Sequence, residues 1–210
     1  MAPIMKNFSY EMNKVHDRLL VLAEMTEGQF ALTQSVVAHG ATHVNKVKKL
    51  DRDIDEKYEE IQEGILNMFI IQTPLPNEIK ALTTIMRMSG ELERIGDQMV
   101  NMMASCEHLN HKDSRSYATT VIEMLGHAGR MHEMCTSILK IYDEEKATTI
   151  IETDRLVDQA FHHFRTELPQ LIQEHPQYIE DFMQYFLISR YIERAADHIV
   201  NIVKRINLIT

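Results

Sequence analysis

Leu92-Glu93-Arg94-Ile95-Gly96-Asp97-Gln98-Met99-Val100-Asn101 is a stretch that returns later as Ile192-Glu193-Arg194-Ala195-Ala196-Asp197-His198-Ile199-Val200-Asn201. Glu, Arg, Asp, Val and Asn recur in register. Both copies have a helical pattern, and residues four apart share one face of a helix, so each copy lines up Glu, Asp and Asn oxygens. Two carboxylates at this spacing repel by roughly 0.2–0.5 kcal/mol in an isolated helix. Because this repulsion recurs at the same positions of both copies, the sequence predicts a duplicated unit with a duplicated site.

The composition is that of a globular and acidic chain. Of its 210 residues, 25% are charged and 44% are hydrophobic, which is typical of folded domains. Glycine (7) and proline (5) are scarce, which predicts few but long elements. The formal charge of −9 argues against nucleic-acid binding, which requires a basic face, and against adsorption to an anionic membrane.

The sequence predicts neither a membrane span nor a secreted protein. No run approaches the ~18–20 apolar residues that cross a bilayer, and the N-terminal residues lack the apolar stretch of a signal peptide. Cys106 and Cys135 form no CxxC motif, and two reduced thiols are typical of a cytosolic protein. We therefore expect a cytoplasmic protein that reaches a membrane only through its partners.

Apolar residues at helical spacing predict six helices and no strands. Gly40 is the expected end of the first helix, and the prolines of 73–77 separate the second helix from the third. The acidic run Asp143-Glu144-Glu145 is expected to cap the fifth helix, and Glu174-His175-Pro176 to end it. The expected helices lie at about 8–39, from 42 to the first proline break, at 78–108, across 121–141, from 143 to the second proline break, and at 177–208.

The repeat extends beyond the opening stretch. Asp51-Arg52-x-Ile54-Asp55 has a counterpart in Asp154-Arg155-x-Val157-Asp158. Each half therefore has three helices, with DxxxD on the middle one and ExxxDxxxN on the last. A long helix buries only one stripe, so three helices must pack together to enclose a core. We expect an all-α fold of two antiparallel three-helix bundles related by a pseudo-twofold, at residues 1–109 and 117–210, joined by a polar linker at 110–116.

The paired acidic motifs predict a cation site in each half. Carboxylate oxygens with an Asn carbonyl suit hard cations such as Mg²⁺, Ca²⁺ or Mn²⁺, whereas iron or zinc would need histidines or further carboxylates. If the two motif-bearing helices of a half face each other, four carboxylates meet, and protons, a cation or arginine must neutralise them. The candidate metal ligands are Glu93, Asp97, Asp51 and Asp55 in the first half and Glu193, Asp197, Asp154 and Asp158 in the second.

An alternative without a metal is that the two glutamates pair with arginines on solvated helix faces, where ion pairs contribute little. The arginines within reach are Arg87, Arg94, Arg190 and Arg194. His198 occurs in the second copy only, so it cannot belong to a duplicated ligand set. The methionines Met86, Met88, Met99, Met102 and Met103 recur at helical spacing, and we interpret them as core residues.

Several enzyme motifs are absent from the sequence. It contains no GxxxxGK[ST] phosphate loop, no GxSxG elbow, no HExxH and no Glu-x-x-His of the ferritin-like di-iron bundles. Neither hydrolase chemistry nor a ferroxidase centre is therefore supported, and no catalytic residue is predicted. No Arg/Lys cluster or glycine-rich nest stands out as a phosphate site.

The two Glu-Arg-x-x-Asp-x-x-Val-Asn copies, with their DxxxD partners, resemble the signature of the PhoU family of phosphate-signalling regulators. The resemblance covers essentially the whole chain, as two repeats and a midpoint linker. It implies two three-helix bundles whose acidic motifs bind divalent or ferric metal ions (Mg, Mn, Fe, Zn or Ni), with the eight carboxylates named above as ligands. Ala195-Ala196 departs from Ile95-Gly96 and is expected to change the geometry of the second site.

The resemblance also implies a function. Such proteins are cytoplasmic, non-enzymatic regulators, often homodimers, that link a phosphate ABC transporter, through its ATPase subunit, to a sensor histidine kinase. They hold the phosphate-starvation response off when phosphate is plentiful. Three other interpretations stay open: a metal-binding accessory protein of another phosphate transporter, a metal-dependent helical-bundle enzyme, and a purely structural helical protein.

Overall fold

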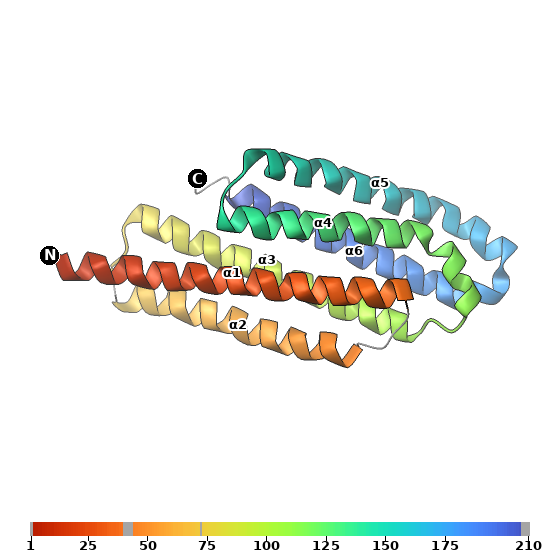
Figure 1. The fold of residues 1–210 in the computed structure, drawn as a ribbon, viewed down its shortest axis with the longest axis horizontal. Coiled ribbons are helices and arrows are strands. Elements are labelled where there is room, and N and C mark those ends of the chain that lie inside the picture. The colour runs from red at the N-terminus through yellow and green to blue at the C-terminus, as the bar shows by residue number, and fades with distance from the viewer. Residues whose placement is uncertain (1, 40–43, 72, 207–210) are drawn as a thin grey trace.

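Six long α-helices make up the computed structural model, which describes residues 2–39, 44–71 and 73–206 (Figure 1). The helices are α1 (Ala2–His39), α2 (Val44–Ile71), α3 (Pro76–Glu107), α4 (Thr119–Lys140), α5 (Glu144–Glu174) and α6 (Ile179–Ile206). Two short 3₁₀ helices, η1 (Lys112–Tyr117) and η2 (Pro176–Tyr178), precede α4 and α6. The described ranges contain no strand, so the predicted all-α class is confirmed.

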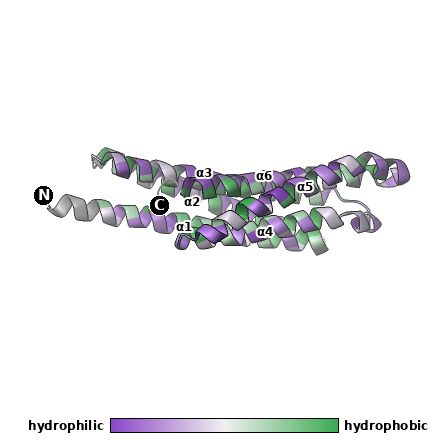
Figure 2. Ribbon diagram, turned by 90° about the horizontal axis from the view of Figure 1, so that it is seen from above, coloured by the Kyte–Doolittle hydropathy of each residue, from purple (hydrophilic) through white to green (hydrophobic). Residues whose placement is uncertain are grey.

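The helices form two packed triplets. α1, α2 and α3 pack against one another, and so do α4, α5 and α6. The triplets meet where α1 packs on α4 and α3 packs on α6, and Figure 2 shows these two pairs as two layers. Glu91 of α3 contacts His198 of α6, and Asn110, three residues beyond the end of α3, contacts Asp181 near the start of α6, so these two helices run antiparallel. The predicted pair of antiparallel three-helix bundles is therefore confirmed.

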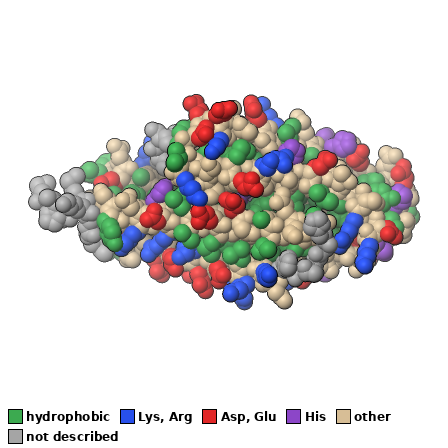
Figure 3. Space-filling view, viewed as in Figure 1, with side chains coloured by type: hydrophobic (Ala, Val, Ile, Leu, Met, Phe, Trp, Pro, Cys, Tyr) green, Lys and Arg blue, Asp and Glu red, His purple; other side chains and the backbone are tan. Residues whose placement is uncertain are grey.

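The apolar residues of both triplets form a single hydrophobic core. Met88, Met99, Met102 and Met103 are buried in it and Met86 packs against it, as expected for core methionines. A flexible, unbranched side chain fills the irregular gaps between six crossing helices. The face seen in Figure 3 carries acidic and basic side chains interspersed with small apolar patches.

The two cysteines are free and buried, and each is held in the apolar core. Burial raises the pKa of the Cys106 thiol and that of the Cys135 thiol to about 12. Thiols with such a high pKa are unreactive, because the thiolate is the nucleophile. None of the helices in the described ranges has the length and apolar content needed to cross a membrane.

The helix ends agree with the sequence at most positions. Asp143 caps α5, since its Oδ1 accepts hydrogen bonds from the backbone N–H groups of Glu145 (3.0 Å) and Lys146 (3.1 Å). α3 begins at Pro76, two residues before the predicted start, because proline suits a first helical turn. α1 begins at Ala2, not at Phe8, and Pro3 in its first turn is likewise tolerated. The expected stop at Gly40 and start at Thr42 lie outside the described residues.

Replacing Asp143 with alanine is expected to lower the free energy of unfolding by about 1 kcal/mol, the usual contribution of an N-cap carboxylate. The two backbone donors would then depend on water alone. Urea denaturation followed by circular dichroism measures the change. Asp113→Ala is the control, because the side chain of that exposed aspartate accepts no hydrogen bond in the described part of the chain. An equal loss in both variants would contradict the capping role.

The segment expected to be a polar linker is folded. Residues 112–117 form η1, in which Ser114 is fully buried. Asp181, itself buried in α6, accepts hydrogen bonds from the backbone N–H groups of Asn110 (2.9 Å) and His111 (3.0 Å). Despite burial, these bonds and that of Ser114 hold the pKa of Asp181 below its usual value. The chain is therefore tied to α6 as it passes from α3 to α4.

Candidate functional site

The structure brings the predicted acidic residues together in each half. We call Asp51, Asp55, Glu93 and Asp97 the first acidic cluster, and Asp154, Asp158, Glu193 and Asp197 the second acidic cluster. In each cluster the DxxxD residues come from the middle helix (α2 or α5) and the others from the last (α3 or α6). The first residue of every pair is half-buried and the second is exposed, identically in both halves. Each cluster therefore lies on a surface seam between two packed helices.

The carboxylates of the first acidic cluster repel one another. Desolvation by the packed helices raises the pKa of Asp51, and the charge of Asp97 raises it further against a hydrogen bond from Gln29. Desolvation also raises the pKa of Glu93, as do the charges of Asp97 and Asp55. The pKa of Asp97 is raised by desolvation and by Asp55. A positive charge placed among these groups would relieve this repulsion.

The second acidic cluster has the same electrostatic character. Desolvation raises the pKa of Asp154 to about 6, and the charges of Asp158 and Asp197 add to the effect. Its Oδ1 is buried and has no hydrogen-bond partner in the described residues. Desolvation and neighbouring carboxylates also raise the pKa of Asp158 and of Glu193. A buried carboxylate oxygen that accepts no hydrogen bond needs a bound cation or a proton to neutralise it.

The donor set of both clusters fits a hard cation. All of the ligating atoms would be oxygens, and a bound ion would supply positive charge that holds α2 against α3 and α5 against α6. As the side chains stand, no three His, Cys, Asp or Glu residues in the described ranges are gathered closely enough to hold one ion. The structure thus places the candidate ligands on shared seams, and metal binding stays a prediction.

One residue that contacts the first acidic cluster was not predicted. Gln29 of α1 is fully buried, and its Nε2 donates a hydrogen bond to Asp51 Oδ1 (3.2 Å). Its Oε1 is buried and has no hydrogen-bond partner in the described residues. A Cβ atom at Gly96 would lie 3.1 Å from that oxygen, so the glycine makes room for it. The glutamine was missed because α1 carries no acidic motif that could have marked it.

The asparagines of the repeated stretch do not join the clusters. Asn101 is exposed, and its side chain makes no hydrogen bond in the described part of the chain. Asn201 instead donates from Nδ2 to Glu91 Oε2 (3.4 Å) across the α3–α6 contact. Asn201 therefore serves the contact between α3 and α6.

The arginine alternative holds in one half. Arg190 donates from Nη1 to both carboxylate oxygens of Glu193, at 2.7 and 2.8 Å. In the first half, Gly90 stands where the second copy has Arg190. Glu93 makes no hydrogen bond and no ion pair with any described residue. It lies instead beside an open hollow of about 510 Å³. That hollow is lined by Tyr58, Met86, Arg87, Gly90, Glu91, Glu93, Arg94, Asp97 and Arg205.

A polar network that was not predicted connects the halves beside the clusters. The buried carboxylate of Glu91 pairs with His198 Nδ1 (2.8 Å) and with Arg205 Nη2 (2.9 Å). Burial opposes ionisation, but the hydrogen bonds from Arg205, His198 and Asn201 hold the pKa of Glu91 below its usual value. The signal in the sequence was His198, a titratable residue at one of the positions where the two copies differ. We call these four residues the seam network.

Comparisons with known proteins agree with this architecture. The PhoU domain matches residues 19–105 and 121–206, one match in each half. The "Phosphate-specific transport system accessory protein PhoU homolog" of Clostridium acetobutylicum is 24% identical, over 94% of this chain and 91% of that protein. The protein of the same description from Synechocystis is 22% identical over 96% of this chain and 90% of its own length.

Two solved structures share the fold. The crystal structure of PhoU from Pseudomonas aeruginosa superposes with a TM-score of 0.87 at 19% identity, covering 96% of this chain and 98% of that one. The phosphate transport system regulatory protein PhoU from Streptococcus pneumoniae superposes with a TM-score of 0.84 at 19% identity, covering 96% of each chain. At this identity the likeness establishes the arrangement of the helices.

Proposed function

Because the chain belongs to the PhoU domain family, we propose that it is an accessory regulator of phosphate uptake. In this proposal it is a cytoplasmic homodimer that contacts the ATPase subunit of a phosphate ABC transporter and a sensor histidine kinase. Through these contacts it keeps the phosphate-starvation response off while phosphate is plentiful. The observation that carries the proposal is the pair of PhoU domain matches, each of which spans one acidic cluster.

The mechanism we propose is contact between proteins, without catalysis. α6 exposes an apolar stripe of Ile179, Met183 and Leu187, which are 47%, 45% and 37% exposed. Residues four apart lie on one helix face, so this stripe offers a continuous surface to another protein. Divalent cations on the acidic clusters would remove the repulsion between neighbouring carboxylates and hold the middle and last helices of each half together.

Deletion of the gene in its own host tests the regulatory role. We expect a phosphate-starvation reporter to be active in phosphate-rich medium in the deletion strain, and to be silenced again by the restored wild-type gene. Copurification of the tagged protein with the transporter ATPase and with the kinase tests the two contacts separately. A reporter that stays silent in the deletion strain would reject the regulatory role, whichever proteins copurify.

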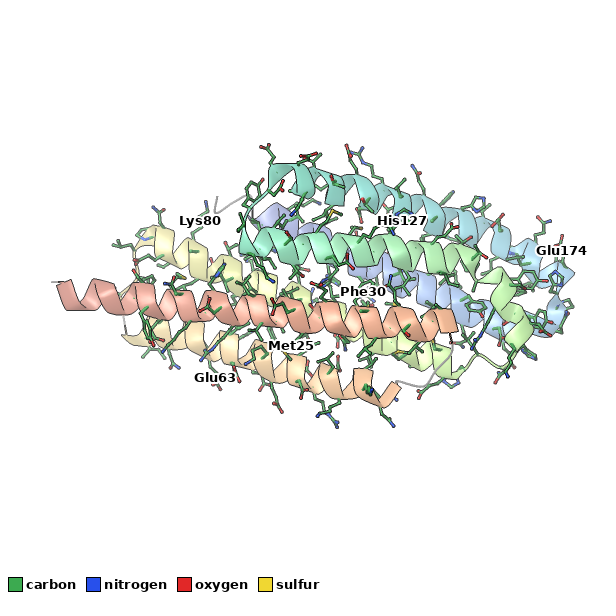
Figure 4. The ribbon with its side chains drawn as sticks, in the orientation of Figure 1. Met25, Phe30, Glu63, Lys80, His127 and Glu174 are labelled. Atoms are coloured by element: carbon green, nitrogen blue, oxygen red, sulfur yellow. The ribbon has the colours of Figure 1, made fainter. Side chains whose placement is uncertain are left out.

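Purified protein is expected to bind Mn²⁺ or Mg²⁺, and Asp97→Ala combined with Asp197→Ala is expected to weaken that binding at least tenfold, because each cluster loses a charged ligand. Isothermal titration calorimetry and elemental analysis provide the measurement. The matched control is Glu63→Ala with Glu174→Ala, two exposed carboxylates on α2 and α5 that belong to neither cluster and are labelled in Figure 4. Unchanged binding in the aspartate variant would remove the assignment.

A further inference from the structure

The exposed side of α6 carries charges placed evenly about an apolar centre. Leu187 is 37% exposed, and Met183 and Ile179 continue its apolar stripe toward the start of the helix. Glu180 lies seven residues before Leu187 and Arg194 lies seven residues after it, and both are exposed. Seven residues are about two turns of helix, so the glutamate, the leucine and the arginine share one face. This face therefore has a negative charge on one side of its apolar centre and a positive charge at the same distance on the other side.

A helix face with this pattern is complementary to itself. If two copies of α6 pack antiparallel with Leu187 on a twofold axis, each Glu180 comes opposite the Arg194 of the other copy. In the same register Gln184 comes opposite Arg190, so no like charges meet at this position. An isologous interface requires this kind of self-complementarity, because the same patch must serve both partners.

The surface of α6 has room for the arginine of a second copy. An open hollow of about 400 Å³ is lined by His108, Asn110, Ile179, Glu180, Met183 and Gln184. In the antiparallel pairing Arg194 of the second copy lies level with Glu180, so its apolar stem would cover Ile179 and Met183 and its guanidinium would reach the carboxylate. Neither charge has a strong partner of its own in the described part of the chain. Glu180 accepts one long hydrogen bond from Asn110 Nδ2 (3.4 Å), and Arg194 makes no hydrogen bond or ion pair there.

The matching face of α3 could not pair in this way. Alignment of the two copies sets Ile179, Glu180, Met183 and Leu187 of α6 against Ile79, Lys80, Thr83 and Arg87 of α3. Arginine is kept at position 94. Two α3 helices in the same arrangement would bring Lys80 against Arg94 and would place two copies of Arg87 together at the axis. The second half thus differs from the first at the positions that make its face both apolar and self-complementary.

We infer that α6 is the homodimer interface, where two copies of the chain pack α6 against α6, antiparallel about Leu187, with two Glu180–Arg194 pairs between them. The inference rests on the proposed homodimer and specifies where its interface lies. One pair of helices covers less surface than the roughly 800 Å² per partner of a standard interface, so we expect a reversible dimer with a Kd on the order of 10 μM. Exposed ion pairs of this kind select the register and orientation more than they add affinity.

Sedimentation velocity of the full chain, from about 1 to about 300 μM, tests the inference by exchanging the charges. Glu180→Lys and Arg194→Glu are each expected to weaken the dimer at least tenfold, because each variant places like charges opposite one another twice. The double variant Glu180→Lys with Arg194→Glu restores both pairs with their signs exchanged and should dimerise as wild type does. Lys80→Glu, at the matching exposed position of α3, is the control and should leave the dimer unchanged.

A cysteine at the axis gives an independent reading. Leu187→Cys should bring the thiols of the two copies together, so that mild oxidation links them into a covalent dimer. Leu156→Cys is the matched control, because Leu156 is 47% exposed but lies on α5, and this variant should stay unlinked. Cys106 and Cys135 are buried and do not compete for the reaction.

The outcomes separate the interface from the proposal on which it rests. A monomeric wild type would overturn both the inference and the proposed homodimer, whereas the reporter experiment judges the regulatory role independently of either. A wild-type dimer that tolerates both single variants, or that the double variant does not restore while circular dichroism shows a kept fold, would overturn the interface alone. Loss of copurification with the transporter ATPase or the kinase in Arg194→Glu, without loss of the dimer, would assign this face to that partner instead.

Discussion

Replacing Glu91 with alanine is expected to lower the free energy of unfolding by about 3 kcal/mol, the lower end of the cost of breaking a buried ion pair. Glu91 is 7% exposed and accepts from three side chains of α6. Without it, His198 and Arg205 would stay at the interface between the halves with no carboxylate to neutralise them. Arg205 Nε is already buried without a partner in the described residues, so losing Glu91 would leave a second nitrogen of this guanidinium without a hydrogen-bond acceptor.

Urea unfolding at pH 7.5 measures this change. Glu107→Ala is the matched control on the same helix, since Glu107 forms an exposed pair with Lys48 at 3.4 Å and should cost less than about 1 kcal/mol. Glu91→Gln keeps the shape and one acceptor oxygen, and an intermediate loss is expected. If Glu91→Ala costs no more than Glu107→Ala, the seam network does not stabilise the contact between α3 and α6.

Much of the fold could be predicted because its signals are local. Asp143 caps a helix through donors two and three residues away, and the prolines near 74 and 176 mark helix breaks in the sequence itself. The folding of residues 110–116 could not be predicted in the same way. Their polar composition is typical of a linker. The residue that orders them, Asp181, comes about 70 residues later in the sequence, after α4 and α5.

The same distinction applies to the site. The eight carboxylates were found because their i, i+4 spacing recurs, and the packing of α2 on α3 and of α5 on α6 follows from the three-helix pattern. Gln29, Arg190 and Glu91 act through contacts that the repeat does not contain. Arg190 and Glu91 stand at positions where the copies diverge, since Gly90 aligns with Arg190 and Tyr191 aligns with Glu91. Comparison of the copies for differences, as well as for matches, would have marked both positions.

Stability is also expected to fall by about 3 kcal/mol as the pH is lowered from 6.5 to 4, through His132 alone. This residue is buried between α4 and α1, where its Nε2 lies 3.0 Å from Thr26 Oγ1 and its ring 5.9 Å from that of Phe30. Figure 4 labels Phe30 on the side of α1 that faces α4. Burial lowers the pKa of His132 from 6.5 to about 4.

The sign follows from proton binding. Between pH 6.5 and 4 the unfolded chain protonates His132 while the folded chain does not, so acid favours unfolding over this range. The acidic clusters work in the opposite direction, because a raised carboxylate pKa, such as that of Asp154 at about 6, makes the folded chain bind protons first. The wild-type profile therefore sums opposing contributions, and His132 must be isolated by a difference.

His132→Gln provides that difference, because glutamine keeps hydrogen-bonding capacity at the same place and does not titrate. Urea unfolding of both proteins from pH 7.5 to 4 is expected to give a stability difference that is constant above pH 7. Below that, wild type should lose about 3 kcal/mol relative to the variant. His127→Gln, at a position on the same helix that is only partly buried, should give a much smaller pH-dependent difference. Parallel profiles for wild type and His132→Gln would mean that the folded protein protonates His132 as readily as the unfolded chain does. Burial between α1 and α4 would then not lower the pKa of this histidine.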